Sequence, residues 1–183
     1  LSLEMALLQT VCMSELGKGP EALELFEKIE TNLKEALAKT EIPAGTTVQV
    51  TVALTGEVER VTPFEKGLPN AVLERDGKIE KDPIVDDQAL VIHLKGKGLV
   101  IIAGCSHAGI INTVLYAQKL TGIEKVHTIL GGFHLSGPHF EPIIEQTIGE
   151  LKRFNPEVLV PMHCTGWTAI QRMSQEFPDA FIL

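Results

Sequence analysis

Three apolar, β-type runs in the second half of the chain each end in a histidine-bearing loop, and a helical pattern soon follows each loop. The three loops are 104–109 with His107, 131–135 with His134, and 161–166 with His163. In an open α/β sheet the carboxyl ends of the strands gather along one edge, and ligands bind there. The sequence therefore predicts an α/β fold that brings three histidines to one edge of its sheet.

Hydrophobic periodicity divides the rest of the chain into elements. The pair Asp76-Gly77 is a strong turn signal and predicts a hairpin that joins 70–75 to 78–81. A length of 183 residues suits one domain, with a helical segment over 1–40 and an α/β part over 45–183. The predicted helices cover 2–15, 21–39, 110–120, 142–154 and 167–177, and the predicted strands cover 46–54, 89–94, 99–103, 125–130 and 158–160.

Composition excludes several classes of partner. The formal net charge is −8 and no cluster of Lys or Arg stands out, so a nucleic-acid partner is not expected. The longest apolar stretch, 98–104, is far too short to span a bilayer, so no membrane partner is expected. Cys12, Cys105 and Cys164 are odd in number and widely spaced, which favours free thiols in a cytoplasmic setting.

The three strand-end histidines are the predicted metal ligands. Neutral imidazole suits zinc, iron, manganese or nickel, and zinc-type catalytic sites commonly use three protein ligands. The expected cofactor is a divalent metal, with zinc favoured. Cys105 and His107 lie two residues apart and could face the same site. Buried, unligated thiols are nevertheless the favoured interpretation for Cys105 and Cys164, because neighbours such as His163 and Cys164 are expected to point apart.

Further polar residues border these loops. The helix that follows 104–109 could offer free N–H groups to a phosphate, and Thr165 precedes a second helix start. The predicted substrate-binding residues are Ser106, Gly109, Asn112 and Thr165.

Acidic residues and one aromatic residue have two interpretations each. Asp86 and Asp87 could bind metal or act as a base, or they could cap a turn and stay solvated. Asp87 and His134 are the predicted catalytic pair. The charged residues Glu57, Arg60 and Glu65 of the loop-rich segment 55–87 could reach a substrate or remain surface charges. Trp167 is expected in the core or in a pocket wall.

Six short motifs together resemble metallo-β-lactamase-fold hydrolases over about residues 45–180. More narrowly, they are similar to the ribofuranosyl-aminobenzene 5′-phosphate synthases of the methanopterin pathway. The motifs are Leu54-Thr-Gly-Glu57, Phe64-Glu65, Asp86-Asp-Gln-Ala-Leu90, Gly104-Cys-Ser-His-Ala-Gly109 with Ile111-Asn-Thr113, Gly131-Gly-Phe-His-Leu135 and His163-Cys-Thr-Gly166.

The resemblance implies a four-layer αββα sandwich with one or two metal ions at one sheet edge. By position, His107 and His163 resemble metal ligands, and His134 resembles a ligand or a residue that grips the substrate. The family's His-x-His-x-Asp-His motif is absent from this sequence. The chain is therefore expected to correspond to the C-terminal half of the fold.

Three functions follow as expectations. The first is a metal-dependent hydrolase that acts on a phosphorylated or ester-bearing small molecule through a metal-bound water. The second is a synthase that joins a phosphoribosyl donor to an aromatic acid. The third is a catalytically silent binding or assembly module. A homo-oligomer or a complementary N-terminal chain is the expected protein partner, because half of a sandwich would expose an apolar sheet face.

Overall fold

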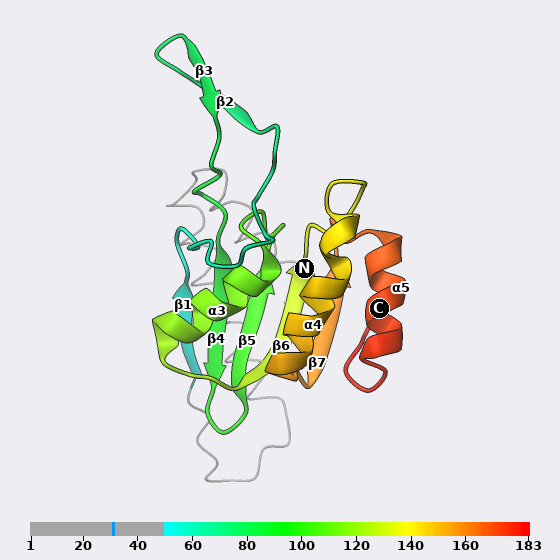
Figure 1. The fold of residues 1–183 in the computed structure, drawn as a ribbon. Coiled ribbons are helices and arrows are strands. Elements are labelled where there is room, and N and C mark those ends of the chain that lie inside the picture. The colour runs from blue at the N-terminus through cyan, green and yellow to red at the C-terminus, as the bar shows by residue number, and fades with distance from the viewer. Residues whose placement is uncertain (1–30, 32–49) are drawn as a thin grey trace.

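A five-stranded mixed sheet organises the protein (Figure 1). The computed structural model describes residue 31 and residues 50–183, so the predicted helices over 2–15 and 21–39 lie outside the described residues, apart from Thr31. The strand order is β1-β4-β5-β6-β7, with antiparallel β1/β4 and β4/β5 pairs and parallel β5/β6 and β6/β7 pairs. The bounds are β1 Val50–Leu54, β4 Ala89–Leu94, β5 Gly98–Ala103, β6 Val126–Gly132 and β7 Val158–Met162.

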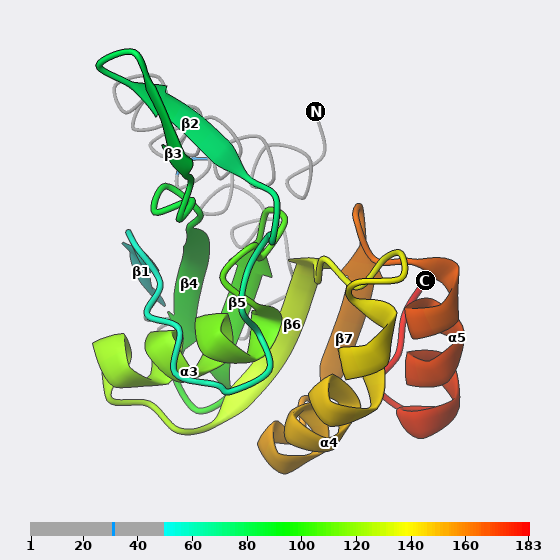
Figure 2. The same cartoon turned by 45° about the horizontal axis from the view of Figure 1, so that its top comes forward.

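Two helical crossovers connect the three parallel strands. Helix α3 (Ile110–Thr121) joins β5 to β6, and the 3₁₀ turn η1 (Glu141–Ile143) followed by α4 (Ile144–Phe154) joins β6 to β7. Helix α5 (Trp167–Glu176) follows β7 and lies beside α4, and Figures 1 and 2 show α3 and α4 over the same face of the sheet. The parallel arrangement places the loops after β5, β6 and β7 at the same sheet edge.

The core lies between these helices and the sheet. Apolar residues of α3, α4 and α5 pack against alternate residues of the central strands, as the helical and strand periodicities require. Representative members that are fully buried are Leu99, Ile101, Ile110, Val114, Ile129, Leu151, Leu159 and Met173.

The predicted α/β class is confirmed. The described helices and strands begin and end within two residues of their predicted limits, and the strand predicted over 46–54 is seen from Val50 onward. In the described residues the helices cover one face of one large sheet, which supplies one helical layer and one sheet layer of the expected sandwich. No helix among the described residues is long and apolar enough to cross a membrane.

The predicted hairpin is also confirmed. Strands β2 (Val72–Arg75) and β3 (Lys78–Lys81) pair antiparallel, and Figures 1 and 2 show them extending away from the main sheet. Asp76 and Gly77 have φ values of 52° and 73°. Two consecutive residues with positive φ are what a two-residue hairpin turn needs, and Asp-Gly supplies them readily.

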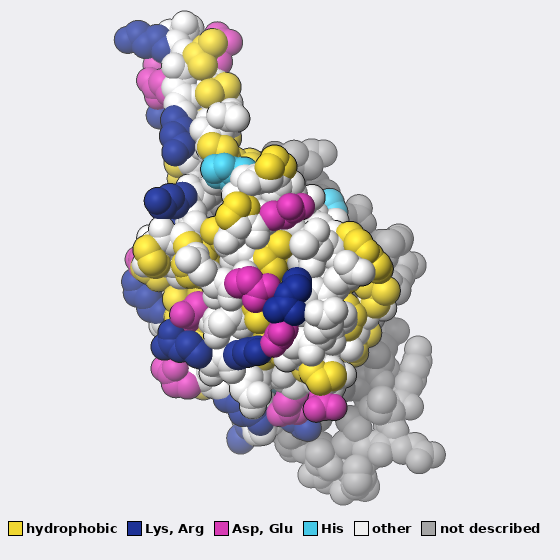
Figure 3. Space-filling view, turned by 45° about the vertical axis from the view of Figure 1, so that its right-hand side comes forward, with side chains coloured by type: hydrophobic (Ala, Val, Ile, Leu, Met, Phe, Trp, Pro, Cys, Tyr) yellow, Lys and Arg dark blue, Asp and Glu magenta, His cyan; other side chains and the backbone are white. Residues whose placement is uncertain are grey.

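The surface of α4 and α5 carries charges of both signs. Arg172 of α5 pairs with Glu145 of α4, and Lys152 of α4 pairs with Glu176 of α5. Figure 3 shows acidic and basic side chains interspersed on this side of the molecule. Trp167, the first residue of α5, is 64% exposed, so the expectation of a core or pocket-wall position is wrong. The side chain lies at the start of the helix, where the amphipathic pattern directs Ala169 and Met173 into the core instead.

Candidate metal centre

The three strand-end histidines converge through a shared cysteine. The rings of His107 and His134 meet with their centroids 4.8 Å apart. Cys105 is hydrogen-bonded to His107, and its Sγ lies 3.1 Å from Nε2 of His163. The loops after β5, β6 and β7 thus bring imidazole and thiol groups to the same sheet edge, where His107 meets His134 and His163 contacts Cys105.

Each of these loops contains one non-glycine residue with positive φ. The values are 56° for Ser106, 49° for His134 and 52° for His163. Such a conformation costs about 1–3 kcal/mol per residue and tends to occur at functional sites, where surrounding structure maintains it. In these loops it turns the chain sharply at the strand ends and directs side chains across the sheet edge.

Asp87 orients His107. Its Oδ2 accepts a hydrogen bond of 2.7 Å from the backbone N–H of Ala108, and its Oδ1 lies 3.5 Å from Nδ1 of His107. The Asp87 carboxylate, assisted by the Cys105 thiol, raises the pKa of His107 to about 10. Of the acidic pair, Asp86 is exposed and Asp87 is buried, so the solvated interpretation is wrong for Asp87. A carboxylate behind an imidazole is the arrangement that fixes the ring of a metal-binding histidine.

His134 has the opposite electrostatic environment. Burial, together with the charge of His107, lowers the pKa of His134. Phe140 holds the ring edge-on, with the two centroids 4.7 Å apart. A neutral imidazole can bind a metal ion or accept a proton, so this environment suits either of the roles predicted for His134.

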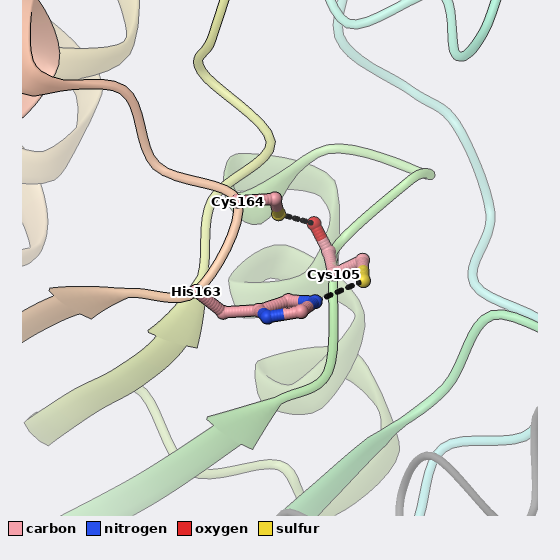
Figure 4. Close-up of side chains that lie close together, drawn as sticks. All are labelled: Cys105, His163 and Cys164. Atoms are coloured by element: carbon pink, nitrogen blue, oxygen red, sulfur yellow. Dashed lines mark hydrogen bonds between the residues drawn. The ribbon is translucent and has the colours of Figure 1, made fainter.

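Two thiols adjoin the histidines. The Cys164 thiol donates to the backbone oxygen of Cys105 at 3.4 Å, and Figure 4 shows both cysteines grouped with His163. The hydrogen bond between the thiols raises the pKa of Cys105 to about 12 and lowers that of Cys164. One ligand atom each from Cys105, His163 and Cys164 lies within 4.8 Å of the others. The expectation that His163 and Cys164 point apart is therefore wrong, because the positive φ of His163 turns both side chains toward Cys105.

Glu65 occupies the start of α3. Its carboxylate accepts hydrogen bonds from the N–H groups of Ile111 and Asn112, at 2.9 and 2.8 Å. Glu65 is buried, so the surface-charge interpretation is wrong for this residue. Burial raises the pKa of Glu65 to about 7, although the two backbone hydrogen bonds act to lower it. The helix start predicted to be open to phosphate is thus satisfied by a carboxylate of the chain itself. Gly109 makes this possible, since a Cβ there would lie 2.2 Å from the Glu65 carboxyl group.

The other predicted substrate-binding residues mainly join loops. Oδ1 of Asn112 accepts hydrogen bonds from the N–H groups of Val61 and Thr62, and the Asn112 amide donates to the backbone oxygen of Ala108. Oγ1 of Thr165 accepts from the N–H of Phe133 and donates to the backbone oxygen of Met162. These bonds give Asn112 and Thr165 a structural role, and their contact with a substrate stays a prediction.

Ser106 differs from these two residues. Its hydroxyl is buried and lacks a hydrogen-bond partner among the described residues. Within the described residues, the predicted contact between the Ser106 hydroxyl and a substrate would therefore not require the loss of an existing hydrogen bond.

A cavity of about 330 Å³ opens beside His107 and His134. Its wall is largely apolar and aromatic, with Lys66 and Glu65 as charged members. His139 is exposed and lines this cavity next to Phe140. A mostly apolar cavity with a few polar groups is typical of a small-molecule site. The neighbouring donors suit a divalent cation, because Nδ1 of His134 is buried without a hydrogen bond among the described residues, and imidazole and thiolate are ligands that zinc prefers.

Comparison with known proteins identifies the class to which this arrangement is similar. The described fold matches the crystal structure of Tm1679, a metal-dependent hydrolase of the β-lactamase superfamily, with a TM-score of 0.59 and 31% sequence identity. That match covers 78% of this chain and 52% of Tm1679. The resemblance to the metallo-β-lactamase fold is therefore confirmed. No protein-family model matches the chain.

Two curated proteins of Methanocaldococcus jannaschii give a narrower comparison. The chain is 38% identical over 106 residues to 7,8-dihydropterin-6-methyl-4-(β-D-ribofuranosyl)-aminobenzene-5′-phosphate synthase, a match that covers 58% of this chain and 35% of that protein. It is 42% identical over 101 residues to an uncharacterized protein, covering 55% and 36% respectively. The match thus spans about a third of the length of each curated relative.

Proposed function

We propose that the chain acts as a metal-dependent hydrolase on a phosphorylated or ester-bearing small molecule. The observation that carries the proposal is the meeting of His107 and His134 beside a cavity of small-molecule size, with His163 at the same sheet edge in contact with Cys105. A divalent cation, zinc in this proposal, would be held by these imidazoles, and when bound it lowers the pKa of water and polarises a phosphoryl or carbonyl oxygen.

The chain's own residues would orient the substrate and move the proton. Asp87 holds His107 in position, so the donor geometry is set before the substrate arrives. His134, neutral and adjacent to the cavity, would accept a proton or grip the substrate oxygen. Lys66 would attract an anionic group, and the hydroxyl of Ser106, which has no hydrogen-bond partner in the described part of the chain, would donate to an oxygen of the substrate.

The test is hydrolysis of chromogenic phosphate esters and carboxylic esters by the purified chain supplied with Zn²⁺. Replacement of His134 by Ala should lower kcat by at least about 100-fold, the usual contribution of a group that moves a proton. The control is His127→Ala, since His127 pairs with Glu157 on another part of the surface. Turnover that is equal in both variants, or absent from the wild type on every ester class, would contradict the proposal.

A synthase is the second candidate. The name of the 38% identical relative supports it, since that protein is a ribofuranosyl-aminobenzene phosphate synthase. A phosphoribosyl donor and an aromatic acid would both need room in the cavity, where Phe64 and Phe140 offer aromatic contacts. Release of pyrophosphate that depends on the aromatic acid would favour this candidate, and ester hydrolysis without such release would favour the first.

A silent assembly module, a homo-oligomer or complementary chain as partner, and a cytoplasmic setting all stay predictions. Light scattering combined with the turnover assays tests the first two. A defined oligomer without bound metal and without turnover would favour the module.

A further inference from the structure

We propose that Cys105, His163 and Cys164 together form a thiolate-rich cation site, which takes a thiophilic divalent cation such as Zn²⁺. The inference deepens the proposed function, and it rests on that proposal through His163, which belongs to both donor sets. It goes further in making two sulfurs, and not imidazole nitrogens alone, the ligands. Its chemical consequence is a preference for zinc or cadmium over hard cations such as magnesium or manganese.

The positions of the donor atoms support this site. Nε2 of His163 lies 3.1 Å from Sγ of Cys105, and all three ligand atoms lie within 4.8 Å of one another. Zinc binds sulfur at about 2.3 Å and imidazole nitrogen at about 2.0–2.1 Å, so tetrahedral ligands are separated by about 3.5–3.8 Å. Small side-chain rotations therefore bring the three atoms to the required spacing.

The backbone holds the three residues together across the middle strand of the parallel group. Cys105 follows β5 and Cys164 follows β7, so β6 lies between them in the sheet. Strand β6 ends at Gly132, whose N–H donates to the backbone oxygen of Gly104 at 2.9 Å. A Cβ on Gly132 would lie 2.8 Å from Sγ of Cys164 and 2.5 Å from that same oxygen. The absence of a side chain at Gly132 is thus what lets the two thiols approach.

The site is also open to an incoming ion. His163 is exposed and both cysteines are half-buried, so the donors reach the surface at the sheet edge. Fully buried structural cysteines would be inert, whereas partly exposed thiols beside histidine can exchange a proton for a cation. Binding of one Zn²⁺ forms two zinc–sulfur bonds and one zinc–nitrogen bond, and each thiol that binds as a thiolate releases its proton to the solvent.

The test is cobalt substitution in the full chain, purified under reducing conditions and stripped of metal. Co²⁺ bound by thiolate gives an intense sulfur-to-cobalt charge-transfer absorption in the near ultraviolet, whereas imidazole ligands alone do not. We expect this band to saturate at one Co²⁺ per chain and to be bleached by one equivalent of Zn²⁺. A wild-type complex with Co²⁺ bound and no such band overturns the inference without reference to any variant.

Variants then locate the sulfurs. Cys105→Ala and Cys164→Ala should each reduce the intensity of the band by about half, and the double variant should abolish it. Cys12→Ala is the matched control and should leave the band unchanged. A band that persists in the double variant or disappears in the control places the thiolate ligands elsewhere and overturns the inference.

The two proposals fail in different ways. If the wild type lacks the charge-transfer band and the double variant still binds stoichiometric Zn²⁺, the imidazole site stands and the thiolate site is ruled out. A wild type with the band but without turnover on any ester would retain the thiolate site and contradict the hydrolase function.

Discussion

Nε2 of His163 lies 3.1 Å from Sγ of Cys105, although 58 residues separate the two in the chain. The contact joins the loop after β5 to the loop after β7, two strands that are not neighbours in the sheet. Cys105 is also hydrogen-bonded to His107, which Asp87 holds from behind. A continuous set of contacts therefore runs from a buried carboxylate to an exposed imidazole, and each residue in it can be tested separately.

Asp87 should tune metal affinity by positioning His107. Replacement by Asn keeps the size of the side chain but weakens its hold on the imidazole, so we expect Zn²⁺ affinity to fall by about 10–100-fold. Isothermal titration with Zn²⁺ measures this change directly. Asp86→Asn is the matched control, because Asp86 is exposed, and its affinity should equal that of the wild type. Equal Zn²⁺ affinities for the two variants would show that Asp87 does not position a metal ligand.

Gly109 should tolerate no side chain. Alanine there would bring a Cβ to within 2.2 Å of the Glu65 carboxyl group at a φ of +103°, so we expect a loss of about 3 kcal/mol or more in the free energy of unfolding. Gly137→Ala is the control, since Gly137 also has positive φ but its Cβ would meet no atom of the described residues within 4 Å. That variant should lose only about 1 kcal/mol, the cost of the backbone conformation. Urea denaturation of the two variants gives the comparison, and equal losses would contradict the close approach of Glu65.

The backbone conformation of Ser106 should lower the stability of the folded protein. Its φ of 56° is unfavourable for any residue with a Cβ, so Ser106→Gly should be more stable than Ser106→Ala by about 1 kcal/mol. Both variants lose the hydroxyl, which makes their difference a measure of the backbone alone. Thermal unfolding of the pair tests this, and an alanine variant as stable as the glycine variant would show that the loop carries no strain at this residue.

Glu65 should make the stability of the protein depend on pH. Burial raises its pKa to about 7 from 4.5, so the folded state holds the proton more tightly than the unfolded state. The stabilisation is full below about pH 4.5 and is lost as the pH rises through 7, a change of about 3 kcal/mol from this residue.

Glu65→Gln removes this titration and provides the test. The free energy by which the variant is less stable than the wild type should be largest near pH 4.5 and should shrink by about 3 kcal/mol by pH 8. Glu57→Gln, at an exposed residue of the same segment, should show no such change. A difference between wild type and Glu65→Gln that is constant with pH would contradict the raised pKa.

Local sequence patterns predicted most of the fold because they act over short distances. The 99–103 run is apolar at every position, and the strand there is buried on both sides of the sheet except at Val100. Asp76-Gly77 specified its turn through backbone preference alone. The position of the three histidines at one sheet edge could also be predicted from sequence, because each lies in the loop that follows a strand of the parallel group.

The thiols and Glu65 could not be assigned in the same way. The shared orientation of His163 and Cys164 depends on a positive φ at His163, and nothing in the local sequence requires that conformation. Glu65 is an acidic residue in an irregular segment, and its partners Ile111 and Asn112 are 46 and 47 residues away. The spacing Cys105-x-His107 was the sequence signal that pointed to a sulfur near the histidines. The contact between Cys105 and His163 depends on the tertiary structure, so local sequence could not predict it.

The most direct test of the shared site is the metal content of the purified chain after equilibrium dialysis against Zn²⁺. The wild type should retain at least one Zn²⁺ per chain, and both His107→Ala and His163→Ala should lose most of it. His127→Ala should match the wild type. Substoichiometric zinc that neither replacement changes would contradict the assembly of one metal centre from the three strand-end loops.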